Sequence, residues 1–473
     1  MNSNSTRFTV DLPKDEATRL ERLAATLLAA FKPAEFAQSH QREWEPDRPS
    51  VGEIRVDDSL GPFWRGEMES NGYSVKSLTF FWGDAAYTLA KDALPLLDEL
   101  AEQWALSPHL KNLSTTEKMK TRLMQWCAQE LRFSHQSRSA DFLLDDLRSD
   151  LAEHEVWVLL AGIDVEGRLP LGKVELRGID AKHVEQWAQS LLDHGSPPEV
   201  VEHQKKQFAK TWQGQTTAAY VALGDRSAVE AAALEHAERA CAMLRVVDPK
   251  SPVPRSRSYL QPVSLKSQAH VRVLLTDPLS KNVSISSQMG LDNEPVALTI
   301  QQKMLPELWE QGGLKWIHEL LSTEPRSAFQ EHLLRAALIY SRQRLTDDPI
   351  EKLIFAISGM ETLLFAGKKG LNQETTKKRL SGSLAGSATF RDHVDQVVKA
   401  AYALRNGFLH HGHKIADLKA VEDFLQLGWF FFRNTLIMHS THATIDSYCA
   451  FLDEAYRSRF VSPSSMDIPA QPA

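Results

Sequence analysis

The chain has 473 residues, of which 42% are hydrophobic and 24% are charged, and its formal net charge at pH 7 is −7. This is the composition of a globular protein that is long enough for two or three domains. The negative charge excludes binding of nucleic acid by bulk electrostatic attraction, so any contact with RNA requires a local cluster of positive charge.

The N-terminal segment, the longest apolar run and the cysteines indicate the cellular compartment. Residues 1–15 are polar and lack the apolar core of a secretory signal. The longest apolar run, residues 427–438, contains polar side chains and is too short to cross a bilayer. The three cysteines are far apart and show no paired metal-ligand spacing: Cys127, Cys241 and Cys449. We therefore expect a cytoplasmic protein with reduced thiols, no membrane partner, no zinc site and no cofactor.

The first third of the chain, residues 1–150, is predicted to be a helix-rich region of unknown role. Residues 14–31 carry leucines at helical spacing, and residues 80–106 and 116–132 have the pattern of amphipathic helices. Residues 41–72 are rich in Pro, Gly, Trp and charge, which predicts a loop with short strands. We find no catalytic motif in this region.

The middle of the chain changes character and is predicted to be an α+β region over residues 151–305. Strands are expected at 155–163 and 171–176, on either side of a glycine-containing turn, and helices at 181–192 and 228–244. Further strands are expected at 216–223, 271–275 and 283–287. This region is a candidate for sensing or regulation.

Residues 306–460 are helical by pattern, and residues 461–473 are expected to form a flexible tail. Asp348-Pro349 is a helix start, with aspartate as N-cap and proline at the first helical position. Apolar stripes at helical spacing follow within 350–364, 394–408 and 425–438. They predict a four- or five-helix bundle with apolar surface left for a partner. The predicted fold class is α+β and multidomain, with an all-α C-terminal bundle.

The second stripe ends in Arg405-Asn406-Gly407-Phe408-Leu409-His410, which combines the residue types that metal-free RNA cleavage needs. Histidine moves a proton near neutral pH. The forked guanidinium of arginine holds a phosphate while negative charge builds up on it. Asparagine can orient either group through a neutral hydrogen bond. The candidate catalytic residues are therefore Arg405, Asn406 and His410.

Spacing alone does not identify this motif, because the chain has 17 histidines and repeats the spacing at Arg148/His154, Arg177/His183, Arg326/His332 and Arg433/His439. What distinguishes it is the surrounding pattern. Asn406 and His410 are four residues apart and share one face of a helix. Gly412 is predicted to end the helix in a left-handed C-cap, which leaves His410 and His411 in the last turn. Carbonyl charge there favours imidazolium.

Helix geometry has two further consequences. Arg405 and His410 are about 140° apart on a regular helix, so one straight helix does not point both side chains at one phosphate. Either the arginine reaches round, or a second copy completes the site across a two-fold axis. We favour the second option, which predicts a homodimer through the C-terminal bundle.

Glu361, at the edge of the first stripe, is predicted to pair with Arg405. A surface-facing glutamate is the alternative.

The C-terminal part of the chain resembles the HEPN superfamily, and within it the Apea-like branch, over residues 325–440. Four blocks carry the resemblance in the expected order: His332–Tyr340, Ile354–Leu364, Leu371–Leu380 and Ala401–Gly412. The second block contains a glutamate-x-leucine-leucine core at Glu361. The fourth is similar to the tyrosine-x-x-arginine block of that branch, which ends in histidine-glycine.

The resemblance implies an endoribonuclease that works as a dimer on an RNA substrate. His410 would be the catalytic histidine, Arg405 the phosphate-binding arginine and Asn406 the polar residue between them. Because Apea-like proteins are often linked to bacterial abortive infection, the resemblance also implies a toxin-like phage-defence effector that responds to a phage or cellular trigger. Other members of the superfamily serve as binding or dimerisation modules.

Additional residues are candidates for supporting roles. Three lie near the motif: Glu361, His411, which rivals His410 as the acid–base group, and Tyr402, which is expected mainly to pack. A basic cluster at Lys377, Lys378 and Arg379, preceded by Lys368 and Lys369, is a candidate RNA contact, although a solvated helix end would carry the same charges. Two other functions stay open. One is a non-catalytic bundle that dimerises, binds a nucleotide or senses a partner. The other is an enzyme in the first 300 residues, where we find no nucleophile–base pair and no phosphate loop.

Overall fold

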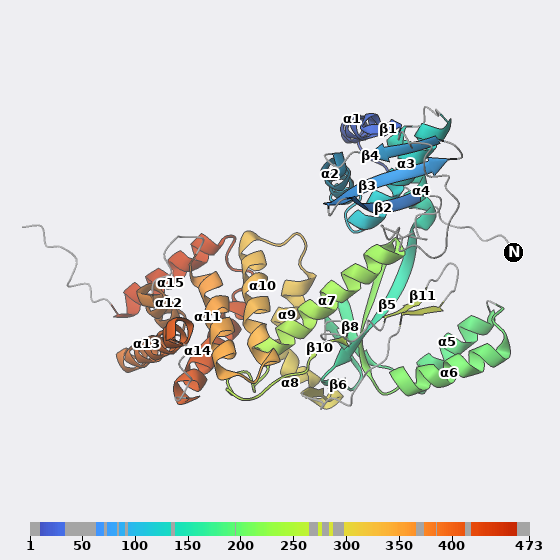
Figure 1. Cartoon of the computed structure of the whole chain (residues 1–473). Helices are drawn as coiled ribbons and strands as arrows, with labels where there is room; N and C mark the ends of the chain where they lie inside the picture. The colour runs from blue at the N-terminus through green and yellow to red at the C-terminus, as the bar shows by residue number, and fades with distance from the viewer. Residues whose placement is uncertain are drawn as a thin grey trace, which may run out of the picture. The chain divides into compact units, whose positions relative to one another are not determined.

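The computed structural model describes residues 10–33, 63–70, 73–82, 85–89, 93–133, 138–193, 195–263, 273–276, 283–286, 298–365, 373–384, 386–411 and 418–460. Contacts between residues divide the chain into two compact units. Unit 1 consists mainly of the chain up to His154 and includes Ala222–Ala232. Unit 2 contains Glu155–Val221, Ala233–Thr276 and the chain from Ser280 onward. The α+β class predicted from the sequence is confirmed (Figure 1).

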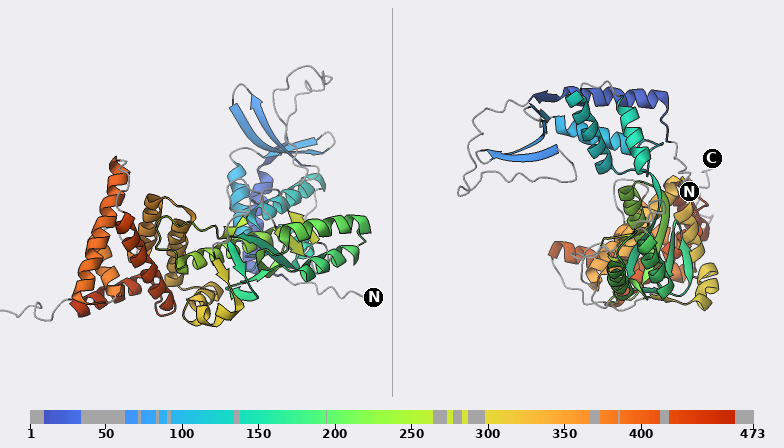
Figure 2. Two further views of the ribbon diagram at one scale, coloured as in Figure 1. Left: turned by 90° about the horizontal axis from the view of Figure 1, so that it is seen from below. Right: turned by 90° about the vertical axis from the view of Figure 1, so that its right-hand side faces the viewer.

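Unit 1 combines helices with an antiparallel sheet. Its helices are α1 (Lys14–Ala29), α2 (Leu94–Ala105), α3 (Thr116–Phe133) and α4 (Ser139–Asp150). Its four-stranded sheet has the order β1-β4-β3-β2, with β1 at Phe31–Pro33, β2 at Phe63–Ser70, β3 at Tyr73–Trp82 and β4 at Ala85–Leu89. The strands are the blue arrows of Figure 2. The predicted helices over 14–31 and 116–132 are confirmed.

The helix predicted over residues 80–106 is wrong in its first half. Phe80 and Phe81 belong to β3 and pair with Tyr87 and Ala86 of β4, and α2 begins only at Leu94. Aromatic and β-branched side chains suit a paired strand better than a helix, and this pairing outweighs the helical spacing of the leucines. Of the loop predicted at 41–72, residues 63–70 form β2 and the rest lies outside the described residues.

A buried arginine holds three elements of unit 1 together. Arg122 is fully buried, and its guanidinium lies 2.7 Å from a carboxylate oxygen of Asp146 and of Asp150. It also donates to the Ser114 hydroxyl at 2.6 Å and lies 3.4 Å from Asp225. A buried charge is tolerated only when it is paired and hydrogen-bonded in this way.

The middle of the chain forms a seven-stranded sheet and a separate two-stranded sheet in unit 2. The long path has the order β12-β11-β5-β9-β8-β7, β10 also pairs with β5, and β13 pairs in parallel with β6. The strands are β5 (Ala152–Ala161), β6 (Ile163–Val165), β7 (Arg168–Leu171), β8 (Val174–Gly178), β9 (Thr216–Gly224), β10 (Gln261–Pro262), β11 (Val273–Thr276), β12 (Val283–Ser286) and β13 (Leu298–Ile300). The helices of this region are α5 (Ala181–Asp193), α6 (Pro198–Trp212) and α7 (Arg226–Val247).

Most of the elements predicted in this region are present, but one predicted strand is wrong and some elements were missed. The predicted single strand over 171–176 is a hairpin of β7 and β8, because the chain reverses after Leu171. Gly172 has a φ of +66° there, and a Cβ atom at this position would lie 2.4 Å from Cβ of Leu321. Only glycine suits such a turn. The sequence prediction also missed α6, whose residues pack on α5 around Trp187 and Phe208.

The C-terminal part of unit 2 is all helical, as predicted. Its described residues form α8 (Leu305–Glu310), α9 (Leu314–Ser322), α10 (Ala328–Ser341), α11 (Pro349–Leu364), α12 (Gln373–Leu384), α13 (Ala388–His411), α14 (Leu418–Ile437) and α15 (Ile445–Phe460). These eight helices exceed the four or five expected. The predicted start of α11 is confirmed, since the Asp348 carboxylate accepts a hydrogen bond from the Ile350 N–H at 2.8 Å.

A tyrosine and two glycines set the close packing of these helices. Tyr340 of α10 is fully buried, and its hydroxyl donates to the Leu425 carbonyl of α14 at 3.2 Å. A Cβ atom on Gly359 of α11 would lie 2.7–2.9 Å from Tyr340, and one on Gly428 of α14 would lie 3.0 Å from the Tyr340 ring. The two glycines therefore let α11 and α14 approach α10 closely enough to bury this side chain.

A second polar network joins the α+β region of unit 2 to its helices. Arg344, after α10, lies 2.7 Å from Asp248, which follows α7. The Ser256 carbonyl accepts hydrogen bonds from Arg344 Nη1 and from Lys352 Nζ of α11, both at 2.6 Å. Lys352 is fully buried, and its burial lowers its pKa to about 7. The network spans nearly a hundred residues of sequence and places two basic side chains against one loop.

Candidate functional site

The motif occupies the C-terminal end of α13. The buried stripe of this helix runs through Val394, Val398 and Ala401 to Tyr402. Beyond Tyr402 the helix becomes exposed: Asn406, Phe408, Leu409 and His410 face solvent, and the side chain of Phe408 is 36% exposed. The stripe predicted to continue to Phe408 therefore ends one to two turns earlier, and the candidate catalytic residues lie where α13 leaves the core.

Glu361 and Arg405 form the ion pair that the sequence predicts. Glu361, on α11, is 8% exposed, so the surface-facing alternative is wrong. Arg405 Nη1 lies 3.6 Å from Glu361 Oε1. This distance exceeds that of a hydrogen bond, so the attraction is mainly coulombic. The Arg405 side chain remains 24% exposed, and the pair therefore anchors the guanidinium without removing it from solvent.

Tyr402 connects this pair to a third helix. Its hydroxyl donates to Glu361 Oε1 at 2.7 Å and lies 3.0 Å from Thr376 Oγ1 of α12. Because the tyrosine has one hydroxyl proton and gives it to Glu361, the Thr376 hydroxyl must be the donor in the second bond. Burial raises the pKa of Tyr402 above its usual range, and Glu361 raises it further. Tyr402 thus remains neutral and packs as expected, while its hydroxyl holds the carboxylate in place.

The Arg405 guanidinium has two further neighbours on its own helix. Its Cζ lies 5.2 Å from the centroid of the Tyr402 ring, within the range of a cation–π contact. Its Nε lies 3.3 Å from the side-chain oxygen of Asn406. Nη2 takes part in none of these contacts. A planar fork that is held from one side and exposed on the other can receive a phosphate oxygen.

The histidines of the motif lie past the ion pair. Since α13 is continuous to His411, Asn406 and His410 share one helix face, and Arg405 and His410 are about 140° apart as expected for a straight helix. The His410 side chain is exposed. The side chain of His411 and the C-cap predicted at Gly412 lie outside the described residues.

The basic residues of α12 divide into different environments. Arg379 is buried, donates to both carboxylate oxygens of Asp453 on α15 at 2.8 and 2.9 Å, and also donates to the Leu364 carbonyl. Lys377 pairs with Glu374 at 2.7 Å. Lys378 is exposed and lines a hollow of about 400 Å³ together with Arg379 and Arg457. Lys368 and Lys369 lie outside the described residues.

The sequence prediction missed some features around this site. Thr376 carries no signal in the sequence because its role depends on the approach of α12 to α13, and Asp453 is 74 residues away from the arginine that it binds.

Within the described ranges, no group of three or more His, Cys, Asp or Glu side chains is arranged to hold a metal ion. Nor does any described helix combine the length and hydrophobicity needed to span a membrane.

Comparison with known proteins adds no relative. No protein-family model matches the chain, and no match was found among curated proteins or among solved structures. We therefore infer the function from the residues of this chain and their geometry.

Proposed function

We propose that the C-terminal helices form a HEPN-like bundle and that the protein is a metal-independent endoribonuclease. The observation that carries this proposal is the way in which the Arg405 guanidinium is held. Its guanidinium is anchored by a buried carboxylate, stays partly exposed, and lies on the same helix end as Asn406 and His410. Phosphate-ester cleavage uses a fixed cation and a histidine, and the end of α13 carries both, on different sides of the helix.

The RNA itself supplies the nucleophile in this mechanism. The ribose 2′-hydroxyl attacks the adjacent phosphorus, and His410 accepts the hydroxyl proton. The bond from phosphorus to the 5′ oxygen breaks, and that oxygen receives a proton from a second histidine, the counterpart of His410 in another copy. Arg405 stabilises the negative charge of the pentavalent phosphate. The products carry a 2′,3′-cyclic phosphate and a 5′-hydroxyl, and DNA is inert because it lacks the 2′-hydroxyl.

A homodimer fits the angular positions of Arg405 and His410 around α13. Arg405 and His410 face different sides of one helix, so two copies of α13 related by a two-fold axis would bring the arginine of one copy towards the histidine of the other. The exposed apolar side chains beside the motif, Phe408 and Leu409, support such an interface, since Leu409 is 56% exposed. In this assembly, Asn406 contacts the phosphate or orients the partner histidine.

Glu361, Tyr402 and Thr376 act as positioning residues in this proposal. They hold the guanidinium at one end and touch no substrate. Lys378, which is exposed on α12, and Lys377, which is partly buried and paired with Glu374, are the candidate contacts for the RNA backbone. Arg379 is excluded from that role in the proposal because Asp453 and the Leu364 carbonyl occupy its donors.

The proposed biological role is that of a toxin-like effector of bacterial abortive infection. An unrestrained cytoplasmic ribonuclease would damage its own cell, and about 300 residues precede the bundle. We assign these residues to sensing a phage or cellular trigger and to restraining the bundle. The polar network of Arg344, Lys352 and Ser256 is a physical connection through which the α+β region of unit 2 could act on α11.

A non-catalytic bundle is the second candidate. The observation that favours it is the ion pair itself, because an arginine held on a buried carboxylate also serves purely structural purposes. In that case the helices dimerise, or bind a nucleotide or a partner, and cut nothing.

The deciding experiment compares three purified proteins on total RNA in EDTA: wild type, His410→Ala and the matched control His203→Ala. His203 is an exposed histidine of α6, far from the motif in sequence. We expect wild type and control to leave cyclic-phosphate ends and His410→Ala to lose at least a hundredfold in rate. Equal cleavage by all three would remove His410 from the mechanism. No cleavage by a dimeric wild type would favour the non-catalytic bundle.

A further inference from the structure

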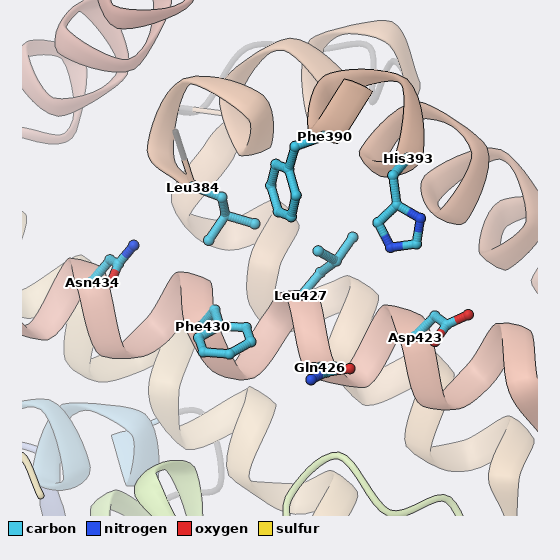
Figure 3. A pocket seen from close by; sticks show the side chains of 8 residues that line it. All are labelled: Leu384, Phe390, His393, Asp423, Gln426, Leu427, Phe430 and Asn434. Atoms are coloured by element: carbon cyan, nitrogen blue, oxygen red, sulfur yellow. The ribbon is translucent and has the colours of Figure 1, made fainter. Parts of the chain in front are cut away.

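A surface hollow of about 340 Å³ lies between the end of α12, the start of α13 and the middle of α14 (Figure 3). Its apolar wall consists of Leu384, Phe390, Leu427 and Phe430. The remaining lining side chains are polar: His393, Asp423, Gln426 and Asn434. In Figure 3, Leu384 and Phe390 point towards Leu427 and Phe430 across the hollow. The size and the mixture of aromatic and polar lining are those of a small-molecule site.

The backbone that carries the first aromatic side chain is closely packed. Gly386 lies under Phe390, and a Cβ atom there would come within 2.6 Å of Phe390 Cβ and 2.8 Å of its Cγ. The Phe390 N–H donates to the Ser387 hydroxyl at 3.3 Å, which fixes the first turn of α13. The second aromatic, Phe430, is 42% exposed and packs on Trp429 with ring centroids 5.1 Å apart. A half-buried ring, that of Phe390, and an exposed ring, that of Phe430, thus border the same space.

The polar side chains provide hydrogen-bonding groups around this space. Asn434 Nδ2 lies 3.5 Å from the Ser383 carbonyl, which orients its amide. Asp423 Oδ1 pairs with Lys419 at 2.5 Å, and the other carboxylate oxygen takes no part in that pair. The exposed amide of Gln426 offers one acceptor and two donors. Among the described residues that line the hollow there is no lysine or arginine, so its chemistry favours a flat, uncharged ring over a phosphate.

We propose that this hollow binds a nucleobase, with the ring against Phe390 and Phe430 and its polar edge at Gln426, Asp423 and Asn434. Bases stack on aromatic side chains and form hydrogen bonds along their edges, and the lining of the hollow provides groups for both interactions. The base comes either from a free nucleotide or from an RNA strand. His393 and Arg405 are about 18 Å apart along α13, a distance that a few nucleotides of one strand span. In the second case the inference rests on the proposed ribonuclease function.

The test measures binding of two kinds of probe to the full chain in EDTA. The probes are the four nucleoside 5′-monophosphates and a mixed-sequence deoxyhexanucleotide, which cannot be cut because it lacks the 2′-hydroxyl. Three proteins are compared by ligand-observed NMR and calorimetry: wild type, Phe430→Ala and the control Phe451→Ala. Phe451 is a similarly exposed phenylalanine of α15 that does not line the hollow. We expect Phe430→Ala to bind roughly tenfold more weakly and the control to bind as wild type does.

The outcomes separate the two sources of the base. Binding of a monophosphate that depends on Phe430 supports a free-nucleotide site, and binding of the hexanucleotide alone with the same dependence supports a strand site. Affinity that is equal in all three proteins overturns the inference. It is also overturned if neither probe binds, or if Phe430→Ala changes only the molecular mass in solution, because a second copy then covers the hollow. None of these results requires RNA cleavage, so a failure of the ribonuclease proposal is seen separately.

Discussion

The buried Lys352 makes unit 2 sensitive to pH in a way that one substitution removes. The Lys352 side chain is 0% exposed, and its Nζ donates to the Ser256 carbonyl at 2.6 Å. Replacing it in Lys352→Met keeps the length and apolar volume of the side chain but removes the charge. The Ser256 carbonyl keeps a donor, because Arg344 Nη1 lies 2.6 Å from the same oxygen. The substitution therefore leaves no buried acceptor without a partner.

The sign and the size of the effect follow from the pKa of Lys352, which burial lowers from 10.5 to about 7. Between these values the unfolded chain binds a proton that the folded chain does not, so the free energy of unfolding rises with pH. Below pH 7 both states are protonated and the folded state carries the full cost of the buried charge. That cost is at most roughly 5 kcal/mol, at about 1.4 kcal/mol per pKa unit. From pH 7 to pH 9 we expect wild type to gain about 2 kcal/mol relative to Lys352→Met.

Urea unfolding at pH 6, 7, 8 and 9 measures this difference. Wild type and Lys352→Met are compared at each pH, so that other titrating groups cancel, and Lys399→Met, which removes an exposed lysine of α13, serves as the matched control. We expect Lys352→Met to be the more stable protein at pH 6 and its advantage to shrink as the pH rises. A difference that does not change with pH would show that Lys352 is not buried as a charge.

Two further predictions concern the candidate site. In Glu361→Gln the amide oxygen still accepts the Tyr402 hydrogen bond, but the neutral side chain no longer attracts the Arg405 guanidinium. We expect the rate of RNA cleavage to fall about tenfold and the melting temperature to change by only a few degrees. An unchanged cleavage rate would mean that the ion pair does not position Arg405. In Leu409→Arg a charge replaces an exposed apolar side chain next to the motif, and light scattering after gel filtration should show a monomer without cleavage activity. The control Leu106→Arg changes a similarly exposed leucine of unit 1; a dimeric Leu409→Arg protein would place the interface elsewhere.

The local features of this chain were accessible from the sequence. The start of α11 follows from Asp348-Pro349, because capping and a fixed proline φ act within one turn. The helices α1, α3, α5 and α7 follow from apolar spacing, which depends only on neighbours along the chain. The pairing of Glu361 with Arg405 could also be predicted, since a carboxylate in an apolar stripe needs a cation and the motif supplies one.

Other features depend on contacts between distant segments, which only the tertiary structure decides. Residues 80–82 and 85–89 are strands because β3 and β4 pair with each other, a contact that the helical pattern predicted over 80–106 does not contain. Arg379 was a candidate RNA contact by charge, but its Nε and Nη2 donate to the carboxylate of Asp453, 74 residues later, and its Nη1 donates to the Leu364 carbonyl. Thr376 and the hollow between α12, α13 and α14 become visible only when the three helices are packed. The sequence by itself determined the helices with regular apolar spacing and the start of α11, because both signals act between near neighbours along the chain. The tertiary structure decided which charges are buried and which are exposed, because burial depends on packing between segments that the local pattern does not contain.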